Sequence, residues 1–130
     1  MTEHRFYGES MPFGNDSLNL DKLTFLNSEQ AISDLAYFIS EMKAKNKYKI
    51  TENTKWIAMS GSYPGALAAW LRYKYPHLVA GAIASSAVIE AIEDFKEFDE
   101  QIYLSTVKSG DYCPEAIKNA NNKVEWILLN

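Results

Sequence analysis

The stretch WIAMSGSYPGALAAW, residues 56–70, changes abruptly from strand-like to helix-like residues at Ser62. The apolar run 56–59 has the length of a strand that is buried on both faces of a sheet. Pro64 suits the first position of a helix, because its ring sets a helical φ and the N–H that it lacks has no partner there. The sequence therefore predicts a strand, a sharp turn that carries the serine, and a helix in direct succession.

A second apolar run completes this unit. The helix is predicted to continue to Tyr75, because Pro76 cannot extend it. Residues 78–84 then indicate another buried strand, so residues 56–85 have the order strand, helix, strand. Strands that are joined in this way are parallel, and the crossover between them is right-handed. The pattern predicts the α/β fold class.

The rest of the chain is divided between a loop and a helix before this unit and helices after it. Asn27 is placed to cap the earlier helix, whose apolar residues recur at helical spacing from Ile32 to Met42. Trp56 and Trp70 are expected to pack in the core, as are Tyr73 and Tyr75. The expected segments are a loop over 1–24, a helix over about 28–44, a polar connection over 43–55, a charged amphipathic helix beyond Ala87 and a further helix from Pro114.

The composition limits the partners. The net charge of −4 comes from mixed acids and bases without a basic stripe, which argues against nucleic acid and against an anionic membrane surface as partners. No segment approaches the ~20 apolar residues of a membrane span, and the N-terminal MTEHRFYG lacks the apolar stretch of a signal peptide. Cys113 is the single cysteine, so the chain is either reduced and intracellular or lacks its partner cysteine.

The turn at Ser62 has the character of a nucleophile elbow, in which a strand presents a serine and a helix starts at once. The unpaired N–H groups at the start of the helix would stabilise negative charge, and the backbone N–H of Tyr63 would be one oxyanion donor. The usual pattern G-x-S-x-G is not met, because Ser60 and Pro64 stand where it has glycine. A structural turn serine is therefore the alternative.

Three blocks of the chain resemble the prolyl carboxypeptidase and dipeptidyl peptidase group of serine peptidases. The blocks are EHRFYGES with PFG at 3–14, FLNSEQA at 25–31, and GSYPGALAAW with KYPHLV at 61–79. The resemblance runs from about residue 3 to about residue 100. It implies a partial α/β-hydrolase core over 1–87 and the start of a helical cap over 88–130. It also implies a serine exopeptidase that cleaves next to proline through an acyl-enzyme, with no metal and no organic cofactor.

The resemblance assigns roles to individual residues. Ser62 becomes the nucleophile and Tyr63 the oxyanion donor, and Ala66 becomes a neighbour of the pocket that accepts proline. Apart from the resemblance, Glu3 and Glu9 are candidates that orient loops around the cleft or recognise a substrate amine, and the alternative is a buried carboxylate paired with Arg5. Separately, the sequence Asn-Asp-Ser that begins at Asn15 matches an N-glycosylation acceptor, which matters only in a secreted protein.

A base for Ser62 is the missing part of this site. His4 and His77 are the two histidines, and neither fits the order Ser, Asp, His of α/β-hydrolases. The chain therefore resembles an internal piece of a longer protein, and the isolated chain is expected to be inactive. In the longer protein, the resemblance implies a disulfide for Cys113 within the cap.

The sequence is also compatible with other hypotheses about function. One is a different α/β-hydrolase chemistry, that of an esterase or lipase, and another is a catalytically silent truncated product that at most binds peptides or partner chains. The resemblance does not distinguish a carboxypeptidase from a dipeptidyl peptidase, and it leaves a homodimeric parent open. It implies a lysosomal or secreted location and peptide substrates that contain proline.

Overall fold

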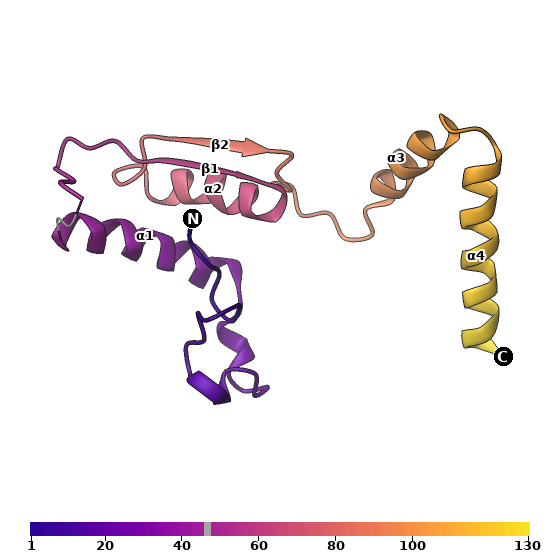
Figure 1. Cartoon of the computed structure of the whole chain (residues 1–130), viewed down its shortest axis with the longest axis horizontal. Coiled ribbons are helices and arrows are strands. Elements are labelled where there is room, and N and C mark those ends of the chain that lie inside the picture. Colours follow the sequence, from indigo (N-terminus) through magenta and orange to yellow (C-terminus); the bar gives the residue numbers. More distant parts are fainter. Residues whose placement is uncertain (46–47) are drawn as a thin grey trace. The chain divides into compact units, whose positions relative to one another are not determined.

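The computed structural model describes residues 1–45 and 48–130, which fall into two compact units, residues 1–90 and 91–130. The predicted connection over 43–55 includes residues 46–47, which lie outside the described residues. The first unit contains α1 (Ser28–Lys45), β1 (Ile57–Gly61), α2 (Ser62–Lys74) and β2 (Gly81–Ser85), and the second contains α3 (Lys96–Val107) and α4 (Tyr112–Leu129) (Figure 1). Two short 3-10 turns, Gly14–Asp16 and Leu23–Phe25, lie in the predicted N-terminal loop.

The two strands form a parallel sheet with α2 between them in the chain. The register runs from Ile57 opposite Gly81 to Gly61 opposite Ser85. Helix α2 packs against both strands, and α1 packs against α2 (Figure 1). This arrangement confirms the predicted α/β class, with a small parallel sheet.

The core of the first unit lies between α1, α2 and the segment that leads into β2. Asn27 caps α1 as predicted, because its Oδ1 accepts the N–H of Gln30 at 2.9 Å. Trp56 and Trp70 are partly buried and pack against this core, in agreement with the sequence. The buried apolar residues of the cluster are Ala31, Ile32, Ala36, Ile39, Leu67, Leu71 and Val79.

Two details of the predicted burial are wrong. Ile57 and Met59 on β1 are 65% and 74% exposed, and Ile83 on β2 is 54% exposed, whereas the sequence predicted that both strands are buried. Strand β2 also begins at Gly81, three residues later than the predicted strand over 78–84. Successive side chains of a strand point to opposite faces, and within the described residues helices cover only one face of this sheet. Tyr73 is 84% exposed, because it lies on the side of α2 away from Leu67 and Leu71.

The ends of the helices differ slightly from the sequence prediction. Helix α2 begins at Ser62 rather than Pro64, and α4 begins at Tyr112 rather than Pro114. Both prolines still lie in the first turn of a helix, where an N–H has no partner within the helix. None of the described helices is long and apolar enough to cross a membrane.

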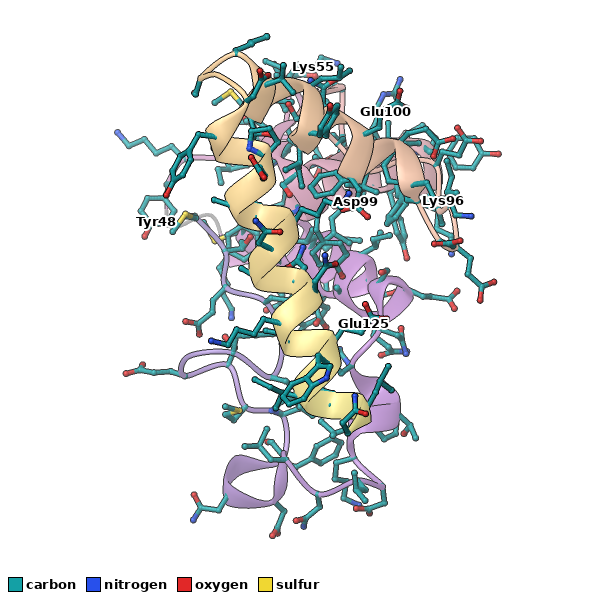
Figure 2. All side chains as sticks on the ribbon, turned by 90° about the vertical axis from the view of Figure 1, so that its right-hand side faces the viewer. Tyr48, Lys55, Lys96, Asp99, Glu100 and Glu125 are labelled. Atoms are coloured by element: carbon teal, nitrogen blue, oxygen red, sulfur yellow. The ribbon has the colours of Figure 1, made fainter. Side chains whose placement is uncertain are left out.

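The second unit is a pair of helices that contact each other. No side chain of α3 or α4 is fully buried, and the apolar residues Phe98 and Ile102 of the predicted amphipathic helix are 61% and 45% exposed. The charged residues Lys96, Asp99 and Glu100 lie on α3, and Glu125 lies on α4 (Figure 2). These apolar side chains of α3 are therefore not covered within this unit.

The close packing of α2 on the strands predicts that Gly65 tolerates no large side chain. A Cβ atom at Gly65 would lie 3.2 Å from the Cβ of Ala87 and 3.3 Å from the carbonyl oxygens of Ser60 and Ser85. We expect Gly65→Val to lower the free energy of unfolding of the full-length protein by about 1–3 kcal/mol, measured by denaturant titration.

Gly81→Ala is the matched control, because nothing lies within 4 Å of a Cβ at Gly81. We expect this substitution to change stability by less than about 0.5 kcal/mol. Equal stability of the two variants would show that α2 does not need to approach the strands this closely.

Candidate active site

Ser62 lies at a one-residue turn between β1 and α2. Gly61 has the extended dihedral angles φ −129° and ψ 165°, Ser62 has φ +55°, and the helix starts at Ser62 itself. A left-handed conformation in a residue other than glycine costs of order 1–3 kcal/mol, so the surrounding structure must hold it in place. The turn presents the serine at the surface, where its side chain is exposed. This geometry confirms the predicted sharp turn.

Glycines on both sides of Ser62 allow the strand and the helix to approach each other. A Cβ atom at Gly61 would lie 3.3 Å from the carbonyl oxygen of Ser85, and one at Gly65 would meet the same atom at 3.3 Å. Gly65 thus performs the close-packing role although it stands three residues after the serine rather than two. Ser60 is half-buried at the position where the usual pattern has glycine, and the turn accommodates it.

The first turn of α2 is electrostatically suited to hold an anion. The N–H of Tyr63 is among the first four of the helix, which have no carbonyl partner within it. No side chain caps this end, and the first turn contains no acidic residue. The positive end of the helix dipole therefore faces the serine without a neutralising group, which is the arrangement that stabilises developing negative charge.

The side chain of Tyr63 is held by two other segments of the chain. Its hydroxyl lies 3.3 Å from Nε2 of His4 and 3.2 Å from Oγ of Ser28. The rings of His4 and Tyr63 are 5.9 Å apart between centroids, and Tyr7 meets His4 edge-on at 5.5 Å. The sequence did not single out Ser28 as a site residue, although it lies in the block FLNSEQA, because it is 35 residues from Tyr63 and only the fold brings the two together.

The two histidines lie at opposite ends of α2. His4 contacts Tyr63 at the start of the helix, and no hydrogen bond joins it to Ser62 within the described residues. His77 lies beside the ring of Tyr75, at a centroid distance of 6.1 Å, just past the C-terminal end. The helix has 13 residues, which at 1.5 Å per residue is about 20 Å. His77 is therefore far from the turn.

Arg5 connects the N-terminal segment to α1. Its Nε and Nη2 atoms each donate to the carboxylate of Asp34 at 2.6 Å, and Nη1 donates to the carbonyl of Phe25 at 3.1 Å. The hydrogen bonds that Arg5 donates to the Asp34 carboxylate are the main cause that raises the pKa of Arg5 above its ordinary value. The carboxylate that pairs with Arg5 is thus Asp34, and the alternative in which Glu3 pairs with Arg5 is wrong.

Glu3 organises the loop that follows it. Its Oε2 accepts the N–H groups of Glu9 at 3.0 Å and Ser10 at 2.9 Å. Gly8 has φ +54° in this loop, and a Cβ atom there would overlap the carboxylate of Glu3. The loop therefore requires glycine at this position, and the Glu3 carboxylate has two partners before any substrate is present.

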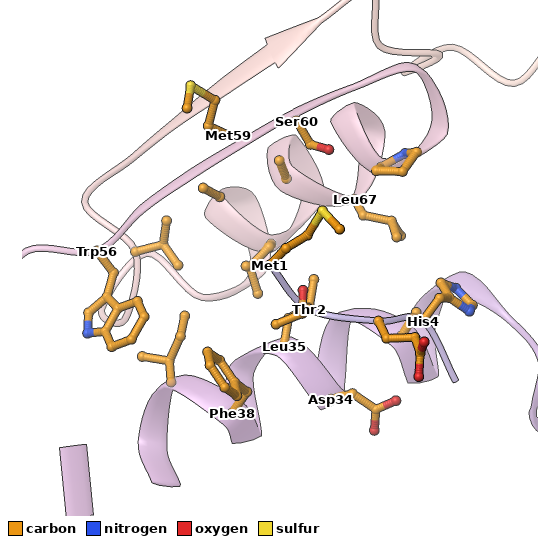
Figure 3. Close-up of a pocket in the computed structure, with 18 of the residues that line it drawn as sticks. Met1, Thr2, His4, Asp34, Leu35, Phe38, Trp56, Met59, Ser60 and Leu67 are labelled. Atoms are coloured by element: carbon orange, nitrogen blue, oxygen red, sulfur yellow. The ribbon is translucent and has the colours of Figure 1, made fainter. Parts of the chain in front are cut away.

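Two hollows border the turn. The first has a volume of about 300 Å³ and lies between α1, the N-terminal segment, β1 and α2, with Trp56 and Phe38 at one end and His4 and Asp34 at the other (Figure 3). The second has a volume of about 410 Å³ and is lined by His4, Tyr7, Leu26, Asn27, Ser28, Tyr63 and Pro64. Ala66 lines neither hollow and is fully buried, so its place beside a substrate pocket stays a prediction.

Asn15 and Cys113 are the remaining candidate residues. Asn15 is exposed, whereas the hydroxyl of Ser17 in the same acceptor pattern is buried and accepts the N–H of Phe13 at 3.0 Å. Cys113 is a free, half-buried thiol in the second unit. Among the described residues, no cluster of three His, Cys, Asp or Glu side chains could hold a metal ion.

A parallel strand that ends in a left-handed serine at the start of a helix defines an α/β protein with the geometry of a nucleophile elbow. The sequence profile of the serine carboxypeptidase S28 family matches residues 1–130, and the chain belongs to this family. The chain is 46% identical over 132 residues to lysosomal Pro-X carboxypeptidase of Homo sapiens, covering 98% of this chain and 25% of the relative.

Two further relatives are covered to a similar extent. The chain is 42% identical over 127 residues to lysosomal Pro-X carboxypeptidase of Mus musculus, covering 95% of this chain and 26% of the relative. It is 38% identical over 127 residues to thymus-specific serine protease of Homo sapiens, covering 95% of this chain and 24% of the relative. The chain thus spans about a quarter of the length of the curated relatives that it matches.

The geometry of the Arg5 and Asp34 pair predicts that lysine cannot replace the arginine. Lysine keeps the charge but loses the planar fork that makes two parallel hydrogen bonds. We expect Arg5→Lys to lower the free energy of unfolding of the full-length protein by about 1–2 kcal/mol. Because the pKa of Arg5 is raised, the charged guanidinium stabilises the fold at every pH below the ordinary pKa of arginine. We therefore expect Arg5→Lys to lower the free energy of unfolding by the same amount at pH 6 and at pH 9.

Lys74→Gln is the control for this measurement. Lys74 makes a single contact of 3.1 Å to Glu29, and the two side chains are 48% and 76% exposed. Exposed pairs of this kind contribute less than about 1 kcal/mol. If Lys74→Gln and Arg5→Lys lower the free energy of unfolding equally, the two parallel hydrogen bonds of Arg5 do not stabilise the protein more than an exposed ion pair does.

Proposed function

We propose that the protein containing this chain is a serine exopeptidase that cleaves peptide bonds next to proline through an acyl-enzyme on Ser62. The observation that carries the proposal is the exposed serine with φ +55° at the junction of β1 and α2. Membership of the serine carboxypeptidase S28 family supports it. The names of the relatives support a serine protease more generally and action at proline in particular.

The proposed reaction begins with attack by Oγ of Ser62 on the carbonyl carbon of the scissile bond. A general base takes the hydroxyl proton as the new bond forms, and the carbonyl oxygen becomes an oxyanion. The N–H of Tyr63 and the positive end of α2 stabilise this oxyanion. The same base then gives the proton to the leaving amine, and water hydrolyses the acyl-enzyme to restore the serine.

The base is proposed to come from the part of the longer protein beyond this chain. His4 is engaged with Tyr63 and Arg5, and His77 is at the other end of α2. A histidine and an orienting acid supplied by a different segment would complete the site. In this proposal, residues 1–87 form part of the α/β-hydrolase core and residues 88–130 begin a cap that restricts access to chain ends.

The proposal also covers the substrate, the compartment, the modifications and the oligomeric state. We propose peptides that contain proline as substrates and the lysosome as the compartment, since lysosomal Pro-X carboxypeptidases are among the relatives. A disulfide of Cys113 in the cap, a glycan on Asn15 and a homodimeric state stay predictions. The choice between a C-terminal residue and an N-terminal dipeptide as the product is settled by analysing products from one set of proline-containing peptides.

Removal of the Ser62 hydroxyl should abolish activity of the full-length protein. We expect Ser62→Ala to reduce kcat by a factor of about 10⁴–10⁶, because the proposed acyl-enzyme forms on the Ser62 hydroxyl that this substitution removes. The measurements are cleavage of proline-containing peptides and labelling by a fluorophosphonate. Short acyl esters tested alongside the peptides distinguish an esterase from a peptidase.

The neighbouring serine provides the control for this experiment. Ser60 lies two residues before Ser62 on β1, and its side chain is half-buried. We expect Ser60→Ala to retain activity within about threefold, since a small residue at this position preserves the packing of the turn. Persistent cleavage and labelling in Ser62→Ala would contradict the proposed function.

The isolated chain of residues 1–130 should not react. A serine hydroxyl is a weak nucleophile without an adjacent base, and neither histidine of this chain is placed to deprotonate Ser62. We expect no fluorophosphonate adduct on Ser62 by mass spectrometry, under conditions in which the full-length protein is labelled. Stoichiometric labelling in a folded, monomeric chain would instead identify His4 as the base.

A further inference from the structure

We infer that His4 and Ser28 are positioning residues, which act through the Tyr63 hydroxyl to hold the peptide group that carries the proposed oxyanion donor. This inference rests on the proposed function. The inference concerns the side chains of His4, Ser28 and Tyr63. They belong to the N-terminal segment, the start of α1 and the start of α2, respectively.

The Tyr63 hydroxyl has a hydrogen-bond partner on each of two other segments. Nδ1 of His4 lies 2.8 Å from the carbonyl oxygen of Arg5, and because a carbonyl only accepts, Nδ1 carries the proton. Nε2 lies 3.3 Å from the Tyr63 oxygen; it accepts the tyrosine proton when the ring is neutral and donates to the tyrosine oxygen when both ring nitrogens are protonated. Oγ of Ser28 lies 3.2 Å from the same oxygen, and either hydroxyl can be the donor. In each case the Tyr63 hydroxyl is hydrogen-bonded to both His4 and Ser28.

Tyr63 needs such an anchor because core packing does not hold it. Its side chain is 42% exposed, whereas the buried residues of α2 begin at Gly65. The residue before it is in a left-handed conformation that is maintained only if its surroundings resist relaxation. With its hydroxyl tied to two other segments, Tyr63 is held at the side chain as well as at the backbone. The orientation of its N–H is thereby restricted.

The anchor is itself supported from α1. His4 donates to the carbonyl of Arg5, and the Arg5 side chain is bound to Asp34 on α1 by two hydrogen bonds of 2.6 Å. His4 and Asp34 both lie at the end of the first hollow away from Trp56 (Figure 3). The carbonyl of His4 also accepts the N–H of Tyr7 at 3.1 Å, which fixes the backbone of the loop. The imidazole is therefore attached to a constrained segment.

The test removes only the tyrosine hydroxyl, in the full-length protein. We expect Tyr63→Phe to lower kcat about fivefold to tenfold, which corresponds to the loss of about one hydrogen bond, and to change KM by less than twofold. The rate of fluorophosphonate labelling of Ser62 should fall by the same factor. A purely structural role would lower the melting temperature without this selective effect on kcat.

Tyr73→Phe is the matched control on the same helix. Tyr73 is 84% exposed, and its hydroxyl makes no hydrogen bond to a described residue. We expect this variant to have the kcat and KM of the unaltered protein. An equal fall in kcat for Tyr63→Phe and Tyr73→Phe would overturn the inference.

The two positioning residues are tested by conservative rescue. We expect Ser28→Ala to lower kcat and Ser28→Thr, which keeps the hydroxyl, to restore it. His4→Ala should lower kcat, and adding it to Tyr63→Phe should give less than the product of the two single effects, because both remove the same hydrogen bond. Independent, multiplicative effects would overturn the coupling.

The outcomes separate this inference from the proposed function. If Ser62→Ala abolishes activity while Tyr63→Phe leaves kcat unchanged, the positioning role is wrong and the serine peptidase assignment stands. If Tyr63→Phe raises KM and leaves kcat unchanged, the hydroxyl binds substrate and the positioning role is wrong. If Ser62→Ala remains active, the proposed function itself fails.

Discussion

The chain reverses its local structure at one residue, and the first unit depends on that constraint. Gly61 is extended, Ser62 is left-handed, and the helix starts at once, so α2 must run back along the strands that it connects. This close approach leaves no room for a side chain at Gly65. It also directs the open N-terminal end of α2 toward the serine. The turn at Ser62 therefore determines both the close packing at Gly65 and the positive electrostatic environment of the serine.

A set of polar contacts connects this turn to parts of the chain that are distant in sequence. Asp34 on α1 binds Arg5, the carbonyl of Arg5 binds His4, and His4 meets the hydroxyl of Tyr63. The donor and acceptor roles in the first two contacts are determined by chemistry, since a guanidinium only donates and a carbonyl only accepts. A strained turn next to a half-exposed tyrosine gains rigidity from such contacts, because the first three residues of α2 are exposed and core packing does not hold them.

Sequence reasoning was accurate where local pattern determines structure. The strand, the turn and the helix around Ser62 follow from residue type and periodicity, and so does the helix that Asn27 caps. It was inaccurate where burial depends on neighbouring elements. Ile57 and Met59 were expected to be buried because the run is apolar, yet a strand face is covered only if another element packs on it. Likewise, Tyr73 was assigned to the core although it lies on the outer side of α2.

The sequence by itself determined the α/β class, the place of the serine turn and the family resemblance, because these depend on short segments whose chemistry is local. Only the tertiary structure showed that Asp34, rather than Glu3, pairs with Arg5, and that Ser28 and His4 meet at Tyr63. It also showed that Gly65 fills the packing role three residues after the serine. These contacts join residues up to 59 positions apart, and such distances close only when α1, α2 and the N-terminal segment pack together.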